Sequence, residues 1–217
     1  MSTHSLTRRT FLAGTTLAGL ATATGRGILL PPVWAAAAAK VGEPAPGFTT
    51  PATTGKGVSL ADQRGKIVVL EWTNHDCPYV RKHYESGNMQ MLQREITGQG
   101  VVWLTLVSSS PGTQGYVTPK QADELTSTRK ANPTAVLLDP TGVVGRVYGA
   151  TNTPHMYVID KSGLLVYAGA IDDRPTTRRS DVQEAHNYVR AALDDIAAGR
   201  PVQTPVTRAY GCTVKYA

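Results

Sequence analysis

The stretch GKIVVLEWTNHDCPYV, from Gly65 to Val80, decides the expected fold of this chain. Its first half is a continuous apolar run of strand length, rich in β-branched residues, which is typical of a strand covered on both faces. Pro78 comes directly after Cys77 and suits the first turn of a helix, where its missing N–H has no partner to lose. The stretch therefore predicts a buried strand, a tight turn and a helix, with Cys77 at the helix N-terminus.

Strands and helices alternate through the rest of the chain. A loop with a short hairpin precedes the stretch, and the tail after residue 199 has no clear period. The expected elements are a helix over 79–100 that breaks near Ser86–Gly87, a strand over 101–108, a helix over 118–133 opened by Thr118, a strand over 134–139, a short helix over 141–150, a strand-turn-strand over 155–170, and a final helix from Ser180 to Gly199. This order predicts one α/β domain with a central mixed sheet, helices on both faces and a C-terminal antiparallel hairpin.

The first 39 residues have the composition of an export signal. Arg8 and Arg9 precede a weakly apolar run, and the segment closes on small residues in PPVWAAAAAK. This pattern predicts a twin-arginine signal over residues 1–39, a domain over 40–217, and a periplasmic or exported location. The alternative is a membrane anchor, but the run is short and is followed by Arg26, so no stable membrane span is expected after cleavage.

The net charge excludes one class of partner. The whole chain carries +6, and loss of Arg8, Arg9 and Arg26 without any acidic residue lowers this to +3. So small a positive charge does not indicate nucleic-acid binding. In an oxidising compartment the two cysteines can be joined, yet one disulfide does not make a disulfide-rich domain, so the core must come from apolar burial.

Cys77 is the main candidate for chemistry. A helix N-terminus favours an anion, and Arg81 and Lys82 add positive charge in the first turn, so all three features favour the nucleophilic thiolate. Two alternatives stay open, an inert core or structural cysteine and a metal ligand. His75, Cys77 and His83 are the alternative ligand set for copper or zinc, although each histidine is explained more simply as a polar residue of a pocket or helix surface. We expect no cofactor.

Three segments carry a family resemblance: VGEPAPGF, GKIVVLEWTNHDCPYV and NTPHMYVIDKSGLLVYAGAID. Together they extend from Val41 to Asp172. In these segments the chain resembles the thioredoxin-like superfamily and, within it, the redoxin branch (AhpC/TSA, thiol-specific antioxidant and peroxiredoxin-like proteins). The resemblance implies a thioredoxin-like fold and a thiol-dependent oxidoreductase.

The resemblance also implies roles for single residues. Cys77 matches the nucleophilic cysteine, and Pro154 after Thr153 matches the proline whose cis bond faces it. Thr153 and Pro154, with Pro78 and Asn74, would seat the substrate. Glu71 stands where thioredoxins carry a buried acid that relays a proton, and a buried acid needs a partner or a task. The alternative is that Glu71 lies wet at a sheet edge.

The chain departs from its relatives at two places. Thioredoxins have C-x-x-C, whereas CPYV places Val80 at the second cysteine. Peroxiredoxins have P-x-x-x-T-x-x-C, whereas Leu70 and Asn74 stand at the proline and threonine positions. A peroxidase pocket is therefore less well supported, although Asn74 or His75 could supply a polar contact.

Cys212 is the remaining possible partner of Cys77. The resemblance allows it to be a resolving cysteine far along the chain; a structural disulfide and an unpaired thiol are the alternatives. The function expected is an exported thiol–disulfide oxidoreductase or antioxidant protein, acting on a protein disulfide or a peroxide with a thiol reductant. A thiol peroxidase, a copper- or zinc-binding module and a non-catalytic binding fold are the alternatives.

Overall fold

The fold centres on one mixed five-stranded sheet with the order β5-β4-β3-β7-β8. In this computed structural model, residues 38–217 are described, so the expected export signal lies almost wholly outside the described residues. β3 is parallel to β4 and β4 to β5, whereas β7 is antiparallel to both β3 and β8. The strands are β3 (Val68–Trp72), β4 (Val102–Val107), β5 (Ala135–Leu138), β7 (His155–Ile159) and β8 (Leu165–Gly169).

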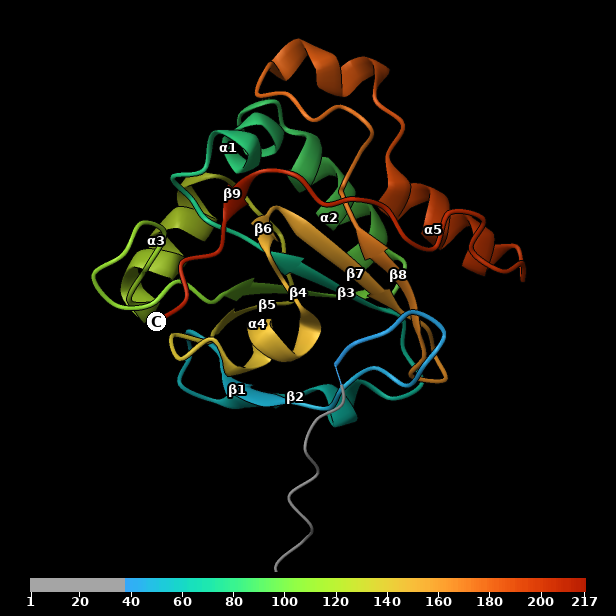
Figure 1. Cartoon of the computed structure of the whole chain (residues 1–217), viewed down its shortest axis with the longest axis horizontal. Helices are drawn as coiled ribbons and strands as arrows, with labels where there is room; N and C mark the ends of the chain where they lie inside the picture. Colours follow the sequence, from blue (N-terminus) through green and yellow to red (C-terminus); the bar gives the residue numbers. More distant parts are fainter. Residues whose placement is uncertain (1–37) are drawn as a thin grey trace, which may run out of the picture. The chain divides into compact units, whose positions relative to one another are not determined.

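Helices cover both faces of this sheet, as the sequence predicts (Figure 1). One face packs against α1 (Pro78–Glu85), α2 (Asn88–Gly98) and α5 (Tyr188–Ala197). The opposite face carries α4 (Val143–Tyr148) and the hairpin of β1 (Thr49–Pro51) and β2 (Gly57–Ser59), which is followed by the short helix η1 (Leu60–Gln63). α3 (Pro119–Thr128) packs beside β4 and β5.

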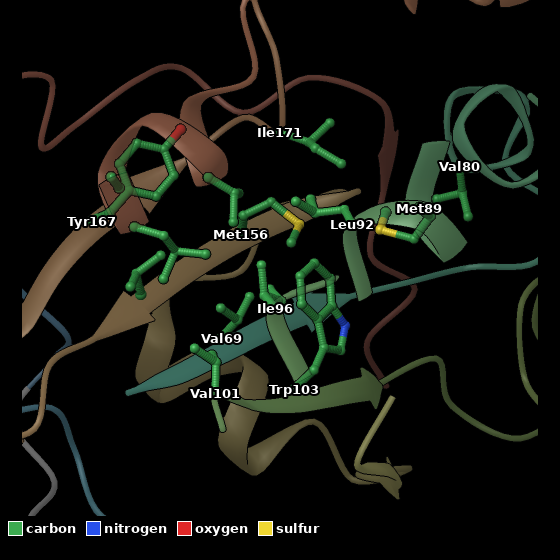
Figure 2. Packing of buried hydrophobic residues seen from close by; sticks show 14 of the residues in the cluster. Val69, Val80, Met89, Leu92, Ile96, Val101, Trp103, Met156, Tyr167 and Ile171 are labelled. Atoms are coloured by element: carbon green, nitrogen blue, oxygen red, sulfur yellow. The ribbon is translucent and has the colours of Figure 1, made fainter. Parts of the chain in front are cut away.

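Alternation along β3 divides the core into two clusters. Val69 faces α1, α2 and α5, where it packs in a cluster with Trp103 and Met156 (Figure 2). Leu70 and Trp72 point to the opposite face. All five residues of β3 are buried, as expected of a central strand covered on both sides. Cys77, five residues after the end of β3, therefore follows a strand that is buried along its whole length.

Local signals in the sequence explain most element boundaries. Gly87 has φ 77° between α1 and α2, which confirms the predicted break. Thr118 caps α3 through its side chain, also as predicted. No helix within residues 38–217 is long and apolar enough to cross a membrane.

The end of the chain differs from the prediction in two ways. The expected helix from Ser180 to Gly199 is two elements, a 3-10 helix η2 (Arg179–Glu184) and α5, which is capped by Asn187 rather than by Ser180. The tail, predicted without regular structure, forms a strand. This strand, β9 (Cys212–Thr213), pairs antiparallel with β6 (Asn152–Thr153).

Candidate active site

Cys77 occupies the N-cap position of α1, at the end of the short turn that follows β3, and Pro78 opens the helix. Its side chain is 0% exposed. The thiol donates a hydrogen bond to the backbone oxygen of Thr153 over 3.1 Å. The predicted strand-turn-helix geometry at Cys77 is therefore confirmed, and the thiol faces the β6 segment.

β6 brings the cis peptide bond and the second cysteine to the same place. The Thr153–Pro154 bond is cis, and Thr153 is the register partner of Cys212 in the β6–β9 pair. The backbone N–H of Cys212 donates to Sγ of Cys77 over 3.4 Å, across 135 positions of sequence. Both cysteines are free thiols. Burial, together with the contact to Cys77, raises the pKa of the Cys212 thiol to about 12.

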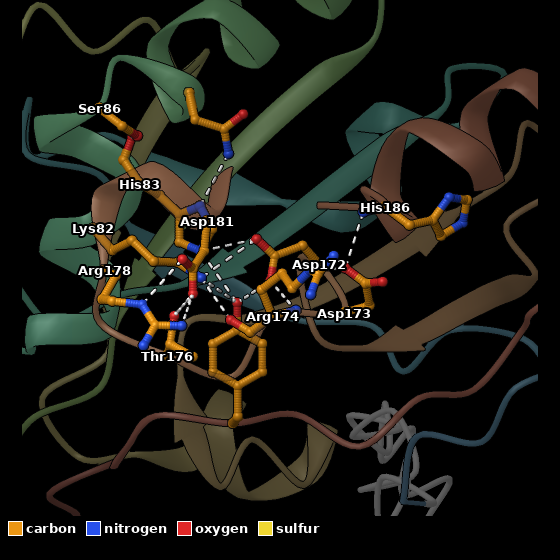
Figure 3. Close-up of polar contacts among 12 residues, drawn as sticks. Lys82, His83, Ser86, Asp172, Asp173, Arg174, Thr176, Arg178, Asp181 and His186 are labelled. Carbon is orange, nitrogen blue, oxygen red and sulfur yellow. Dashed lines mark hydrogen bonds and ion pairs between the residues drawn. The ribbon is translucent and has the colours of Figure 1, made fainter. Parts of the chain in front are cut away.

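The two cations of α1 point to partners other than the thiol. The guanidinium of Arg81 donates to Glu85 over 2.8 Å on the helix surface. The ammonium of Lys82 is buried, 2.7 Å from the backbone oxygen of Arg174 and 3.5 Å from Oδ2 of Asp172 (Figure 3). These contacts tie both charges to acids or carbonyls, so they do not support the predicted stabilisation of a thiolate by Arg81 and Lys82.

Glu71 is fully buried in β3 rather than wet at an edge. Its carboxylate accepts hydrogen bonds from four donors, of which Trp103 Nε1 and Tyr84 OH are the nearest at 2.8 Å each. Thr105 Oγ1 and Gln93 Nε2 donate over 3.0 and 3.2 Å. Burial raises the pKa of Glu71 despite these bonds.

No hydrogen bond in the described part of the chain links Glu71 to Cys77. The four donors account for both carboxylate oxygens without recourse to catalysis. Transfer of a proton from Glu71 therefore stays a prediction.

Asn74 and His75 shape the turn before Cys77. Oδ1 of Asn74 accepts from the backbone N–H of Asp76 over 2.9 Å, which is an Asx turn. His75 lies beside Asp76, its Nε2 3.4 Å from the carboxylate, and its backbone oxygen accepts from Arg129 over 2.9 Å. Burial lowers the pKa of His75. Binding of substrate by Asn74, Pro78, Thr153 or Pro154 stays a prediction.

The alternative metal site is not assembled. Among residues 38–217, no three His, Cys, Asp or Glu side chains gather as a metal would need. His83 is fully buried, with Nε2 3.3 Å from the hydroxyl of Tyr210 and Nδ1 3.0 Å from Asn88. His83 therefore belongs to a different cluster from His75 and Cys77.

Comparison with known proteins agrees with this geometry. A protein-family model described as the AhpC/TSA family matches residues 41–168, which is more than half of the chain. The chain belongs to the AhpC/TSA family. The resemblance to the redoxin branch is therefore confirmed, and a thiol-dependent oxidoreductase is the enzyme class that the family supports. The match ends before Cys212, so it covers the nucleophile and the cis-proline but not the second cysteine.

Solved structures share the fold across nearly the whole domain. An uncharacterized conserved protein from Geobacillus kaustophilus is 25% identical, with a TM-score of 0.70 over 82% of this chain and 93% of its own. A hypothetical protein from Sinorhizobium meliloti is 23% identical, with a TM-score of 0.70 over 84% and 97%. A structure described as a putative protein disulfide isomerase from Bacteroides thetaiotaomicron is 20% identical, with a TM-score of 0.53 over 76% and 96%. A search of curated proteins found no match.

Sequence reasoning missed two residues of this region, Tyr210 and Asp172. The hydroxyl of Tyr210 donates to Oδ1 of Asp172, which is 2% exposed. Neither residue stands in a recognisable motif, and their contact joins the loop after β8 to the tail. Tyr210 stands two positions before Cys212, but no pattern in the sequence links it to Asp172.

Proposed function

We propose that this protein is an exported thiol–disulfide oxidoreductase in which Cys77 is the nucleophile and Cys212 the resolving cysteine. One observation carries the proposal. Two free cysteines, 135 positions apart, are brought together beside a cis-proline, with the N–H of Cys212 on Sγ of Cys77. Because C-x-x-C is absent, Cys212 supplies the second thiol that exchange requires.

The reaction has two steps. The Cys77 thiolate attacks one sulfur of a substrate disulfide, forming a mixed disulfide and releasing the other sulfur as a thiolate. Cys212, deprotonated as it reacts, then attacks Sγ of Cys77, forming the Cys77–Cys212 disulfide and releasing the second substrate thiolate. The two thiol protons pass to the two released sulfurs, so the substrate gains two electrons that the protein loses. An external thiol reductant restores both thiols.

The raised pKa of Cys212 gives the two cysteines different roles. At neutral pH the Cys212 thiol stays protonated and is a poor first attacker, because the thiolate is the nucleophile. The order Cys77 first and Cys212 second rests on the position of Cys77 at the N-terminus of α1, where the helix favours a thiolate.

Peroxide reduction is the second candidate, and the AhpC/TSA family match favours it. Attack of the Cys77 thiolate on hydrogen peroxide would give a sulfenic acid and hydroxide; Cys212 would then displace water and close the same disulfide. Against this reading, the position of the peroxidatic threonine holds Asn74, whose side-chain oxygen is bound to the N–H of Asp76.

Export of the protein rests on the twin arginine at Arg8 and Arg9 and the small residues before Lys40. An oxidising envelope is where a regenerated dithiol would meet substrate disulfides. Fractionation of cells that make the full chain, compared with cells that make an Arg8→Lys, Arg9→Lys variant, tests the exported location. We expect the variant to stay inside the cell.

Counting free thiols by mass spectrometry tests the chemistry. The mature reduced protein is treated with one equivalent of hydrogen peroxide or of a small disulfide, then alkylated without reduction. We expect both thiols to disappear together as one Cys77–Cys212 disulfide, and the faster reagent identifies the substrate class. If Cys77 stays reduced with both reagents, the oxidoreductase proposal fails and a binding role replaces it.

A further inference from the structure

The proposed reaction faces an obstacle, because Cys77 is 0% exposed. Part of the cover is the chain's own residues 210–213, here called the C-terminal segment, in which the backbone N–H of Cys212 contacts Sγ of Cys77. Within it, Gly211 O accepts from the side chain of Asn152 over 2.9 Å, and Cys212 O accepts from Thr153 Oγ1 over 3.3 Å. The segment therefore lies along β6, as the red strand beside β6 shows in Figure 1, and the backbone N–H of Cys212 reaches the thiol of Cys77.

β6 lies outside the five-stranded sheet, and within residues 38–217 its strand partner is β9. An edge strand without its partner is a template for another extended chain. Thr153, on this edge, also accepts the hydrogen bond of the Cys77 thiol. An extended polypeptide that brings its disulfide to Cys77 must therefore take the place of the C-terminal segment.

The hydroxyl of Tyr210 anchors the C-terminal segment to three buried side chains. Its hydroxyl donates to Asp172 and lies 3.2 Å from Nζ of Lys82 and 3.3 Å from Nε2 of His83. Asn88 Nδ2, a donor, gives His83 Nδ1 the acceptor role, so Nε2 carries the hydrogen that faces Tyr210. The tyrosine oxygen thus donates once and accepts twice, which uses its full capacity.

The groups beneath Tyr210 are held in a buried ion pair. Lys82 is 1% and Asp172 2% exposed. A buried pair costs desolvation that only good geometry and further hydrogen bonds repay. Here the further bonds come from the Arg174 backbone, whose oxygen accepts from Lys82 and whose N–H donates to Asp172 over 3.0 Å (Figure 3). The hydroxyl of Tyr210 adds another hydrogen bond to Asp172. Lys82 and Asp172 are here called the socket, because both are buried and hydrogen-bonded and the hydroxyl of Tyr210 binds between them.

We propose that Tyr210 is the positioning residue of the resolving half of the site: seated in the Lys82–Asp172 socket, it holds the C-terminal segment on β6. The proposal rests on the proposed function and adds to it a residue that controls access to Cys77 and the return of Cys212. The seated segment closes Cys77 to outside disulfides; after the first attack, reseating of Tyr210 returns Cys212 to Cys77. The contact of Tyr210 with the socket, here called the lock, therefore slows the first attack by Cys77 and speeds the resolution by Cys212.

A surface groove beside the segment offers the approach. It has a volume of about 570 Å³ and is lined by Tyr79, Asn152, Pro175, Tyr210 and Gly211, among others. The Tyr79 and Tyr210 rings meet edge to face with centroids 5.8 Å apart, so the aromatic wall of the groove joins α1 to the segment. A chain entering there meets the segment next to its anchor.

The test compares two matched variants. Tyr210→Phe removes the hydroxyl from the socket but keeps the ring, whereas Tyr216→Phe removes a hydroxyl that donates to Ala150 O over 2.6 Å, farther along the same tail. The reagent is the aromatic disulfide of thionitrobenzoate, whose coloured thiolate is released once when Cys77 attacks and again when Cys212 resolves. Alkylation of Cys77 by iodoacetamide in a Cys212→Ser background measures access alone.

We expect Tyr210→Phe to speed alkylation and the first release by about 10- to 100-fold, the change in an opening equilibrium expected for losing a hydrogen bond to a buried carboxylate. The second release should slow, because the tail no longer reseats. Tyr216→Phe should change both by less than about threefold, as an ordinary neutral hydrogen bond would. Loss of the Tyr210 hydrogen bond also lowers the free energy of global unfolding, so the urea midpoints of both variants are measured, and the opposite change of the two release rates is the result that identifies the lock.

Two results would overturn the lock. The first is a rate of Cys77 alkylation in Tyr210→Phe within about twofold of the reference rate, with both thionitrobenzoate releases still observed. This result would leave the proposed function standing. The other is an equal effect of Tyr216→Phe. If Tyr210→Phe does not fold, Gly211→Ala replaces it: Gly211 has φ 122° and an added Cβ would collide with the Thr153 backbone, so the same opposed rates are expected. Absence of any thionitrobenzoate release in wild type and in Tyr210→Phe alike would instead refute the proposed function.

Discussion

Replacing Glu71 by leucine removes the acceptor at the centre of the buried polar cluster in β3. Trp103 Nε1 would lose the partner 2.8 Å away and has no other in the described residues. Thr105 and Tyr84 can rotate their hydroxyls, and Gln93 keeps a contact of 3.3 Å to Tyr84. Each buried donor left unsatisfied costs about 1 to 3 kcal/mol.

Trp103 is the one donor left without compensation, so the free energy of unfolding should fall by about 1 to 3 kcal/mol in Glu71→Leu. That is a substantial part of the about 5 to 15 kcal/mol of a typical domain. Glu71→Gln should cost far less. Its carbonyl oxygen can keep the three donors now on Oε2, and its amide can donate to Tyr84.

The charge of Glu71 adds a pH dependence with a definite sign. Burial raises the pKa of Glu71 above its usual 4.5, so the unfolded chain ionises first as pH rises. The stability contributed by this group is complete below pH 4.5 and is lost as pH rises toward the folded pKa. The variant Glu71→Gln lacks this loss, so its stability relative to wild type should improve with pH over that window.

Urea unfolding of the reduced protein at several pH values measures these differences as shifts in midpoint at constant slope. Thr105→Val, which deletes one donor and leaves the carboxylate, is the control and should cost about 1 kcal/mol. The reasoning is refuted if Glu71→Leu lies within 1 kcal/mol of wild type, or if Glu71→Gln is as damaging as Glu71→Leu.

Three further predictions follow from the same structure. Closing the Cys77–Cys212 disulfide, which spans 135 positions, should raise the unfolding free energy by up to about 5 kcal/mol over the reduced form; equal urea midpoints in oxidised and reduced protein would contradict this. Burial, with Lys82 beside it, lowers the pKa of His83 to about 3, so between pH 6.5 and 3 only the unfolded chain carries a proton on this histidine. The free energy of unfolding should therefore fall by about 1.4 kcal/mol for each unit by which the pH is lowered through this range. A His83→Gln variant should lose that part of the slope, and an unchanged slope would show that His83 is accessible. The predicted proton relay by Glu71 requires that Glu71→Gln shift the pH profile of Cys77 alkylation in a Cys212→Ser background, and an unchanged profile would exclude that role.

Local pattern was enough to predict the region around Cys77. A β-branched apolar run, a cysteine and a proline at the first helical position specify strand, turn and helix within one short stretch, and no distant partner is needed. The hairpin of β7 and β8 and the break at Gly87 were predictable for the same reason. The mixed α/β architecture followed from the order of these elements, and the thioredoxin-like sheet was implied by the family resemblance.

The tail could not be predicted, because a two-residue strand has no period to recognise. β9 exists since β6 offers it an edge, and β6 lies about sixty positions earlier. The Tyr210 socket likewise joins α1, the loop after β8 and the tail, which no motif connects. Ser180 resembled a helix cap, yet Asn187 is held extended by a bridge to Asp172, so α5 begins only after it.

The central claim is that Cys77 attacks and Cys212 resolves, and trapping the mixed disulfide tests it most directly. Reduced wild type, Cys212→Ser and Cys77→Ser are each mixed with glutathione disulfide and followed by intact mass without reduction. We predict a lasting glutathione adduct on Cys77 in Cys212→Ser, a transient adduct replaced by the internal disulfide in wild type, and no adduct of comparable rate in Cys77→Ser. An adduct that persists equally in wild type would show that Cys212 does not resolve it, and one that forms equally fast in Cys77→Ser would show that Cys77 is not the nucleophile.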